Sequence, residues 1–149
     1  MGIMNSQATA EKQLEIVLAE DNKGDVFLVQ EALELHGVRA HLTVYRDGEQ
    51  MYRFIDHIDV GKVPCPDLVL LDLNLPKRNG EALLTRMRQS PRCAQVPVII
   101  VTSSDSPNDR ETIARLGASS YFRKPSDFDE FMKLGSTVKN VLHQASSPV

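Results

Sequence analysis

The chain has 149 residues, which is enough for a single domain with a sizeable core. Its composition, 42% hydrophobic and 25% charged without tryptophan, is that of an ordinary globular protein. The net charge of -3 argues against nucleic acid or an anionic membrane as a partner. Because the sequence has neither a membrane-length apolar run nor a signal peptide, we expect a cytoplasmic protein, with flexible ends at 1–13 and 144–149 around a domain at 14–143.

Strand-like and helix-like segments alternate along residues 14–143. In chain order, the patterns predict a strand at 14–19, a helix at 25–37, a strand at 41–45, a helix at 48–58, a strand at 67–72, a helix at 80–90, a strand at 96–102, a helix at 107–117, a strand at 119–123 and a helix at 126–143. The strands at 14–19, 67–72 and 96–102 are apolar throughout, as in strands buried on both faces. This alternation predicts an α/β fold, a doubly wound five-stranded parallel sheet with five helices. Periodicity does not give the strand order, and we adopt 2-1-3-4-5, one of the two common orders.

Polar residues follow the carboxyl ends of the predicted strands, the edge at which open α/β sheets bind ligands. Glu20 and Asp21 follow the first strand, and Asp72 follows the third. Thr102 ends the fourth strand, and Lys124 follows the fifth. In the adopted order the switch point lies between the first and third strands, so the three acids should meet in one crevice flanked by Thr102 and Lys124.

Three acids in one crevice require compensation. Two carboxylates about 4 Å apart repel by roughly 4 kcal/mol at an effective dielectric constant near 20, so such a crevice takes up protons or a cation. Oxygen ligands with room for water suit Mg²⁺ or Mn²⁺. With a metal, Lys124 and Thr102 would clamp a phosphoryl group. Asp72 would then be a metal ligand, an attacking carboxylate, or both.

Four stretches resemble, in order and spacing, the receiver domain of two-component response regulators. They are "AED", "LLDLNLPKRNG", "VPVIIVTS" and "YFRKP", and the resemblance covers about residues 14–142. It implies the flavodoxin-like receiver fold and a phosphoryl group accepted by Asp72 from a sensor histidine kinase. It also implies Mg²⁺ held by Glu20, Asp21, Asp72 and the backbone carbonyl of Asn74.

The same resemblance implies roles for residues around Asp72. Thr102 would be the switch hydroxyl that moves toward the phosphoryl group, and Tyr121 the aromatic residue that changes position with it. Lys124 would pair with the phosphoryl oxygens. A cis peptide bond would precede Pro125, which is unusual outside X-Pro sequences. Ser104 and Asn74 lie where receivers tune dephosphorylation; turnover would be limited to phosphotransfer to the protein itself and autodephosphorylation.

A narrower resemblance concerns the stand-alone receivers paired with bacterial phytochromes. It rests on "LAEDNKGDVFLVQEAL", "RDGEQ", "LLDLNLPKRNGEALL", "VTSSD" and "KPSDFDEF". It implies a bacteriophytochrome histidine kinase as the phosphoryl donor. The tail "TVKNVLHQASSPV" departs from that group because it lacks an aromatic-rich ending, which puts contacts made by the tail in doubt.

No DNA-binding or catalytic module follows the receiver-like segment, so we expect an unknown downstream protein to recognise the phosphorylated state. The helix at 126–143 is rich in apolar residues, namely Phe128, Phe131, Met132, Leu134, Val138, Val141 and Leu142. They form either a core stripe or, with the helix at 107–117 and the strand at 119–123, a homodimer face.

Three other functions compete with the receiver interpretation. A phosphohydrolase with an aspartate nucleophile needs a second acid two residues later, where Asn74 cannot perform acid–base chemistry. A flavin or dinucleotide binder needs a glycine-rich or hydroxyl-rich phosphate loop, whereas "EDNKGD" is acidic. A receiver-like scaffold that no longer takes phosphate remains open, although the residue set is complete.

The two cysteines, Cys65 and Cys93, are far apart in the sequence and show no zinc-ligand spacing. We therefore expect two free thiols in a reducing compartment.

Overall fold

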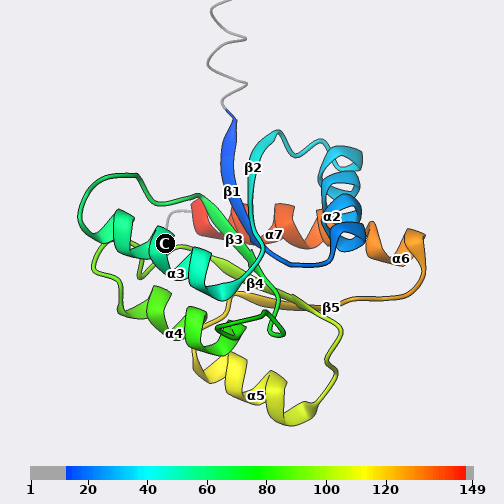
Figure 1. The fold of residues 1–149 in the computed structure, drawn as a ribbon. Helices are drawn as coiled ribbons and strands as arrows, with labels where there is room; N and C mark the ends of the chain where they lie inside the picture. Colours follow the sequence, from blue (N-terminus) through cyan, green and yellow to red (C-terminus); the bar gives the residue numbers. More distant parts are fainter. Residues whose placement is uncertain (1–12, 147–149) are drawn as a thin grey trace, which may run out of the picture.

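Five short strands form one parallel sheet in the order β2-β1-β3-β4-β5 (Figure 1). The computed structural model describes residues 13–146. The strands are β1 (Leu14–Ala19), β2 (Ala40–Tyr45), β3 (Leu68–Leu71), β4 (Val98–Thr102) and β5 (Ser120–Arg123). Every neighbouring pair is parallel, so the predicted fold class and strand order are both confirmed.

The three inner strands are buried on both faces, as their continuous apolar sequences predict. Successive residues point to opposite faces, so Leu18 and Leu70 belong to one core and Val17 and Val69 to the other. Register keeps each pair side by side, because Val17 lies opposite Val69 and Leu18 opposite Leu70. The central strands are thereby fixed, and their carboxyl ends are held at one edge.

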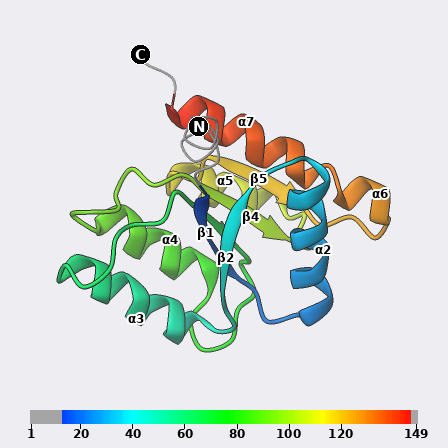
Figure 2. The ribbon, with the colours of Figure 1, turned by 90° about the horizontal axis from the view of Figure 1, so that it is seen from above.

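Helices cover both faces of the sheet (Figures 1 and 2). On one face lie α3 (Gly48–Asp59), α4 (Gly80–Gln89) and α5 (Pro107–Arg115), and on the other lie α2 (Lys23–Leu35), α6 (Phe128–Phe131) and α7 (Leu134–Ser146). All helices but α7 begin after a polar cap whose side chain accepts a hydrogen bond from a backbone N–H in the first turn. Within residues 13–146, no helix is long and apolar enough to span a membrane.

The predicted last helix is divided into α6 and α7. Asp127 caps α6 by accepting a hydrogen bond from the N–H of Glu130. The backbone after α6 forms tighter turns of the 3₁₀ type. The N–H of Lys133 donates to the carbonyl of Glu130 and that of Gly135 to the carbonyl of Met132, each three residues back. A Cβ at Gly135 would lie only 2.6 Å from the Ala32 carbonyl oxygen, so glycine permits the close packing of α7 on α2.

The structure describes only part of the two chain ends that were predicted to be flexible. The helix α7 continues to Ser146, beyond the predicted end at 143, so the first residues of the expected flexible tail are helical. Residues 1–12 of the expected flexible leader, and 147–149 of the tail, lie outside the described residues.

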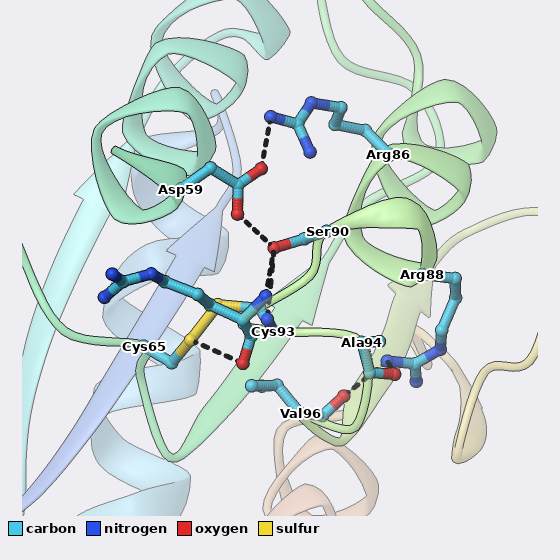
Figure 3. The surroundings of a disulfide bond; sticks show 9 residues. Asp59, Cys65, Arg86, Arg88, Ser90, Cys93, Ala94 and Val96 are labelled. Atoms are coloured by element: carbon cyan, nitrogen blue, oxygen red, sulfur yellow. Dashed lines mark hydrogen bonds and ion pairs between the residues drawn. A yellow bond between two sulfur atoms is a disulfide. The ribbon is translucent and has the colours of Figure 1, made fainter. Parts of the chain in front are cut away.

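The expectation of two free thiols is wrong, because Cys65 and Cys93 form a disulfide bond (Figure 3). Cys65 lies in the segment before β3 and Cys93 in the segment before β4. Since β3 and β4 are parallel neighbours, both segments reach the same edge of the sheet, and the two Cα atoms lie 5.9 Å apart. Sequence spacing does not reveal this proximity, which depends on the strand order.

The predicted cis peptide bond before Pro125 is also wrong, since residues 13–146 contain no cis peptide bond. The trans form of an X-Pro bond is favoured by about 0.5–1 kcal/mol unless the surroundings select the cis form. The ammonium group of Lys124 reaches the acidic residues with the trans bond.

Candidate functional site

The acidic residues expected at the sheet edge do lie together. Ala19 at the end of β1 is paired with Leu71 at the end of β3, so Glu20 and Asp72 leave neighbouring strands side by side. Carboxylate oxygens of Glu20, Asp21 and Asp72 all lie within 4.8 Å of one another. Glu20 and Asp72 are buried, whereas Asp21 is exposed, so the cluster opens to solvent on the Asp21 side.

Lys124 places one ammonium group among these acids. Its Nζ lies 2.7 Å from Glu20, 2.8 Å from Asp25 and 2.9 Å from Asp72. The Lys124 side chain is 11% exposed, so it is bound by the surrounding carboxylates rather than free in solvent. Its position follows from β5, because the N–H of Lys124 donates to the carbonyl of Thr102 at the end of β4.

At Glu20 and at Lys124, burial and the neighbouring charges shift the pKa in opposite directions. Burial raises the pKa of Glu20 to about 7, although the hydrogen bond and positive charge of Lys124 partly offset the rise. Burial by itself would lower the pKa of Lys124, but hydrogen bonds to Asp25, Glu20 and Asp72 outweigh it and raise that pKa. Lys124 is therefore a permanent cation in this site.

Asp25 is the site residue that sequence reasoning missed. It belongs to the first turn of α2, where Asn22 caps the helix, and its carboxylate contacts Lys124. The signal was available in "EDNKGD", because an acid in the first turn after β1 lies at the same edge as Glu20. Asp25 is not among the carboxylates close enough to share a metal ion.

The loop after β3 holds Asp72 in place from the other side. The N–H of Asn74 donates to Oδ1 of Asp72 at 3.1 Å, while Oδ2 accepts from Lys124. Gly80 at the start of α4 packs directly on this backbone, since a Cβ there would lie 2.6 Å from the Asp72 carbonyl oxygen. Glycine is thus required at residue 80 for α4 to begin beside Asp72.

A hydrogen-bonded path leads from Thr102 to Tyr121. Thr102 is fully buried, and its hydroxyl oxygen accepts from the N–H of Ser104 at 3.3 Å. The carbonyl of Ser104 accepts from the Tyr121 hydroxyl at 2.9 Å, while the Ser104 hydroxyl donates to Asp109 at 2.6 Å. The guanidinium group of Arg110 lies over the Tyr121 ring, 4.4 Å from its centre. The loop between β4 and α5 therefore connects the residue at the crevice to the residue on β5.

The donor set fits a divalent cation. Glu20, Asp21, Asp25 and Asp72 bring four carboxyl groups to one ammonium group, which leaves an excess of negative charge. Such an excess in a partly buried crevice favours binding of a hard cation by oxygen ligands. Glu20, Asp21 and Asp72 are the residues able to share it.

Comparison with known proteins gives the family. Residues 16–134 match the model of the response regulator receiver domain. The chain belongs to this family. The response regulator Rcp1 of Synechocystis sp. is 33% identical over 120 residues, which cover 80% of this chain and 82% of Rcp1. The match includes the acidic crevice, the loop after β3 and Lys124.

Solved structures agree with this assignment. The phosphorylated cyanobacterial phytochrome response regulator RcpA has a TM-score of 0.80 at 27% identity, covering 91% of this chain and 98% of RcpA. The Mn²⁺-bound form of Rcp1 has a TM-score of 0.77 at 29% identity, with 91% and 97% covered. The bacteriophytochrome response regulator RtBRR has a TM-score of 0.72 at 31% identity, with 88% and 78% covered. This receiver is therefore related to phytochrome response regulators.

Proposed function

We propose that this response regulator accepts a phosphoryl group on Asp72 from the phosphohistidine of a sensor histidine kinase. The supporting observation is the position of the Asp72 carboxylate, which lies at the carboxyl end of β3 with Lys124 at 2.9 Å. A carboxylate oxygen of Asp72 attacks phosphorus, the phosphorus–nitrogen bond breaks, and the released imidazole takes up a proton. Catalysis is then mainly positioning and charge stabilisation, for which Lys124 is already in place.

Glu20, Asp21 and Asp72 would hold Mg²⁺, or Mn²⁺, together with the backbone carbonyl of Asn74. The Mn²⁺-bound structure of Rcp1, a relative with the same fold, supports this assignment. When bound, the ion neutralises the acidic crevice and stabilises charge on the transferred phosphoryl group. Lys124 offsets part of the remaining negative charge through its contacts with Glu20 and Asp72.

The phosphorylated state would be signalled through the surface formed by α5, β5 and α7. Thr102 would bind a phosphoryl oxygen, which breaks its hydrogen bond with the N–H of Ser104 and shifts the loop before α5. Tyr121 would follow, because its hydroxyl is bonded to Ser104. A local charge change that shifts a two-state element is the general design of such switches. Ser104 and Asn74 would tune autodephosphorylation.

The donor kinase would be a bacterial phytochrome, in a cytoplasmic pathway, with the receiver domain at 14–143. The similarity to RcpA and RtBRR supports the pairing, since both are described as phytochrome response regulators. A downstream protein, not identified by the chain, would bind the phosphorylated form.

A homodimer through α5, β5 and α7 would rest mainly on charge, because most apolar residues of the last helical segment are not available for contact. Phe131, Met132, Leu134, Val138 and Val141 are buried in the core, Leu142 is partly buried, and Phe128 is exposed. Around β5, exposed side chains of both signs lie close together, with Asp105 near Arg110 and Arg123. A two-fold contact requires such self-complementarity. Sedimentation with and without phosphorylation tests the dimer.

The test of the main proposal is phosphorylation by acetyl phosphate with and without Mg²⁺, followed by intact mass measurement. We expect one Mg²⁺-dependent phosphoryl adduct in the wild type and none in Asp72→Asn, which keeps the shape of the side chain. Asp25→Asn is the matched control, because it removes an acid from the same crevice without removing the acceptor. A wild type without adduct, from acetyl phosphate and from a phytochrome kinase alike, would instead favour a receiver-like scaffold.

A phosphohydrolase acting on external substrates is the alternative. It is disfavoured because the residue two positions after Asp72 is Asn74, whose N–H donates to Asp72 and whose side chain supplies no acid. Release of phosphate from small phosphate esters in excess over protein would reverse this assignment.

A further inference from the structure

Cys65 and Cys93 lie at the amino-terminal edge of the sheet, opposite the phosphoryl site. Their Cα atoms are 5.9 Å apart, and their sulfur atoms are bonded (Figure 3). The pair belongs to neither the acidic crevice nor the path from Thr102 to Tyr121, so the proposed function leaves it without a role.

The two cysteine residues differ in solvent exposure. Cys93 is fully buried within the core under α3 and α4, whereas Cys65 is partly exposed. The Cys65 Sγ lies 3.2 Å from the backbone carbonyl oxygen of Arg92, which would accept a hydrogen bond from the Cys65 thiol in the reduced protein. A reagent in solution can therefore reach Cys65, while Cys93 can react only with a sulfur already held beside it.

We propose that Cys65 and Cys93 form a reversible thiol–disulfide exchange site that reacts with a small disulfide or thiol such as glutathione. On oxidation, the Cys65 thiolate attacks oxidised glutathione, whose sulfur–sulfur bond breaks and releases one glutathione thiolate. The Cys93 thiolate then attacks Cys65 sulfur, forming the protein disulfide and releasing the second glutathione. Two electrons and two protons pass from the protein to glutathione. Reduction follows the reverse order and begins at Cys65.

The disulfide bond would link the segments before β3 and β4, a region that is otherwise held by hydrogen bonds. Ser90 at the end of α4 donates to Asp59 at the end of α3 at 2.5 Å, and its hydroxyl oxygen accepts from the N–H of Cys93 at 3.0 Å. Arg88 binds the carbonyls of Ala94 and Val96. These bonds position Cys93 in both redox states, so the reduced protein keeps Cys93 close to Cys65. Oxidation then joins the segments before β3 and β4 covalently without rebuilding this region.

The test uses the folded protein in glutathione buffers of graded composition, without denaturant. After an acid quench, free thiols are alkylated and counted by intact mass. We expect the wild type to change from two alkyl groups to none in one step as oxidised glutathione increases. We expect Cys93→Ala to form a glutathione adduct at least tenfold faster than Cys65→Ala, with circular dichroism confirming that both variants are folded.

Other results would overturn the proposal. Wild-type protein that keeps both thiols at every buffer composition would exclude disulfide formation, and a disulfide reduced only in urea would be a permanent cross-link. Equal adduct rates in the two single variants would exclude Cys65 as the entry point. Hydrogen exchange supplies the second readout: oxidation should slow exchange in residues 60–67 and 90–97, and equal exchange would exclude an effect of the link. Asp72 phosphorylation takes no part in either measurement, so the two proposals succeed or fail separately.

Discussion

The acidic residues of the crevice are not equivalent, although each has the same charge. Glu20, Asp25 and Asp72 each contact the ammonium group of Lys124. Asp21 is exposed and belongs instead to the group of carboxylates close enough to share a metal ion, from which Asp25 is absent. Glu20 and Asp72 belong to both groups, so Asp21 and Asp25 are the two acids that distinguish a candidate metal ligand from an acid that only contacts the lysine.

This difference predicts effects of different size on Mg²⁺ binding for two isosteric substitutions. Asp21→Asn should weaken Mg²⁺ binding by at least about tenfold, because it removes a ligand. Asp25→Asn removes the same charge from the crevice but should have a clearly smaller effect. Calorimetric titration with Mg²⁺ measures both dissociation constants. Equal weakening by the two variants would mean that Mg²⁺ responds only to total charge and that Asp21 is no ligand.

Substitution of Thr102 by alanine should leave phosphorylation of Asp72 intact but abolish the conformational response of β5 and α5. Thr102→Ala retains Asp72 and Lys124, so acetyl phosphate should still give the phosphoryl adduct. Without the hydroxyl, the N–H of Ser104 loses its acceptor and the path to Tyr121 is broken. Amide NMR should therefore show little phosphorylation-dependent change in β5 and α5.

Thr102→Ser is the matched control for this prediction, because it restores the hydroxyl without the methyl group. Its phosphorylated spectrum should resemble that of the wild type. If β5 and α5 of Thr102→Ala responded to phosphorylation as strongly as in the wild type, Thr102 would not be the switch.

At the scale of elements, α3 and α4 are joined at their carboxyl ends by one buried hydroxyl group. Ser90 is 1% exposed, donates to Asp59 and accepts from the N–H of Cys93. Arg86 contacts Asp59 at 2.7 Å from the preceding turn of α4 (Figure 3). The hydrogen bond from Ser90, opposed by burial and supported by Arg86, lowers the pKa of Asp59.

Ser90→Ala should lower the free energy of unfolding by about 1–3 kcal/mol at neutral pH, because it leaves the buried N–H of Cys93 without an acceptor. Urea denaturation measures the change. Ser136→Ala, at an exposed position of α7, is the control and should change stability far less. A neutral result for Ser90→Ala would show that the Ser90 hydrogen bonds add no net stability and that apolar packing and the Arg86 ion pairs hold the two helices.

The same variant should show a defined pH dependence. The folded pKa of Asp59 lies below its ordinary value of 3.8, so the stabilisation from its ionised form is present above that pH. It is lost as the pH falls through the lowered folded pKa. Since Ser90 is the largest cause of the shift, the stability difference between wild type and Ser90→Ala should shrink in acid below pH 3.8. A difference that stays constant to pH 2 would exclude the Asp59 contribution.

Local sequence patterns predicted most of the strands and helices, whereas the features that were not predicted depend on contacts between distant segments. The doubly buried strands are marked by continuous runs of apolar neighbours, so β1, β3 and β4 were found within two residues of their ends. The division of the last helix, in contrast, depends on the packing of Gly135 against α2. The crevice acids were predicted from their positions directly after strands, whereas Asp25 was missed because it lies inside the first turn of α2 rather than at a strand end.

At the scale of the whole molecule, the sheet separates two sites at opposite edges. The carboxyl ends of β1, β3 and β5 present the acidic crevice, and the segments entering β3 and β4 contain the disulfide bond. The strand β3 joins the two edges directly, since Cys65 precedes it and Asp72 follows it. Because β3 is buried on both faces and paired on both sides, it is already fixed without the disulfide. Oxidation should therefore change global stability more than the geometry of Asp72.

This separation gives the last prediction. Joining residues 28 apart restricts the unfolded chain, which on chain-entropy grounds stabilises the folded protein by about 3–4 kcal/mol. Urea unfolding should thus show a higher midpoint for the oxidised protein than for the reduced protein, and Cys65→Ala should be indifferent to the redox buffer. The Asp72 adduct should form at similar rates in both redox forms, because the crevice contacts lie beyond β3. A large change in adduct rate without a change in midpoint would mean that the disulfide acts on the phosphoryl site rather than on the unfolded chain.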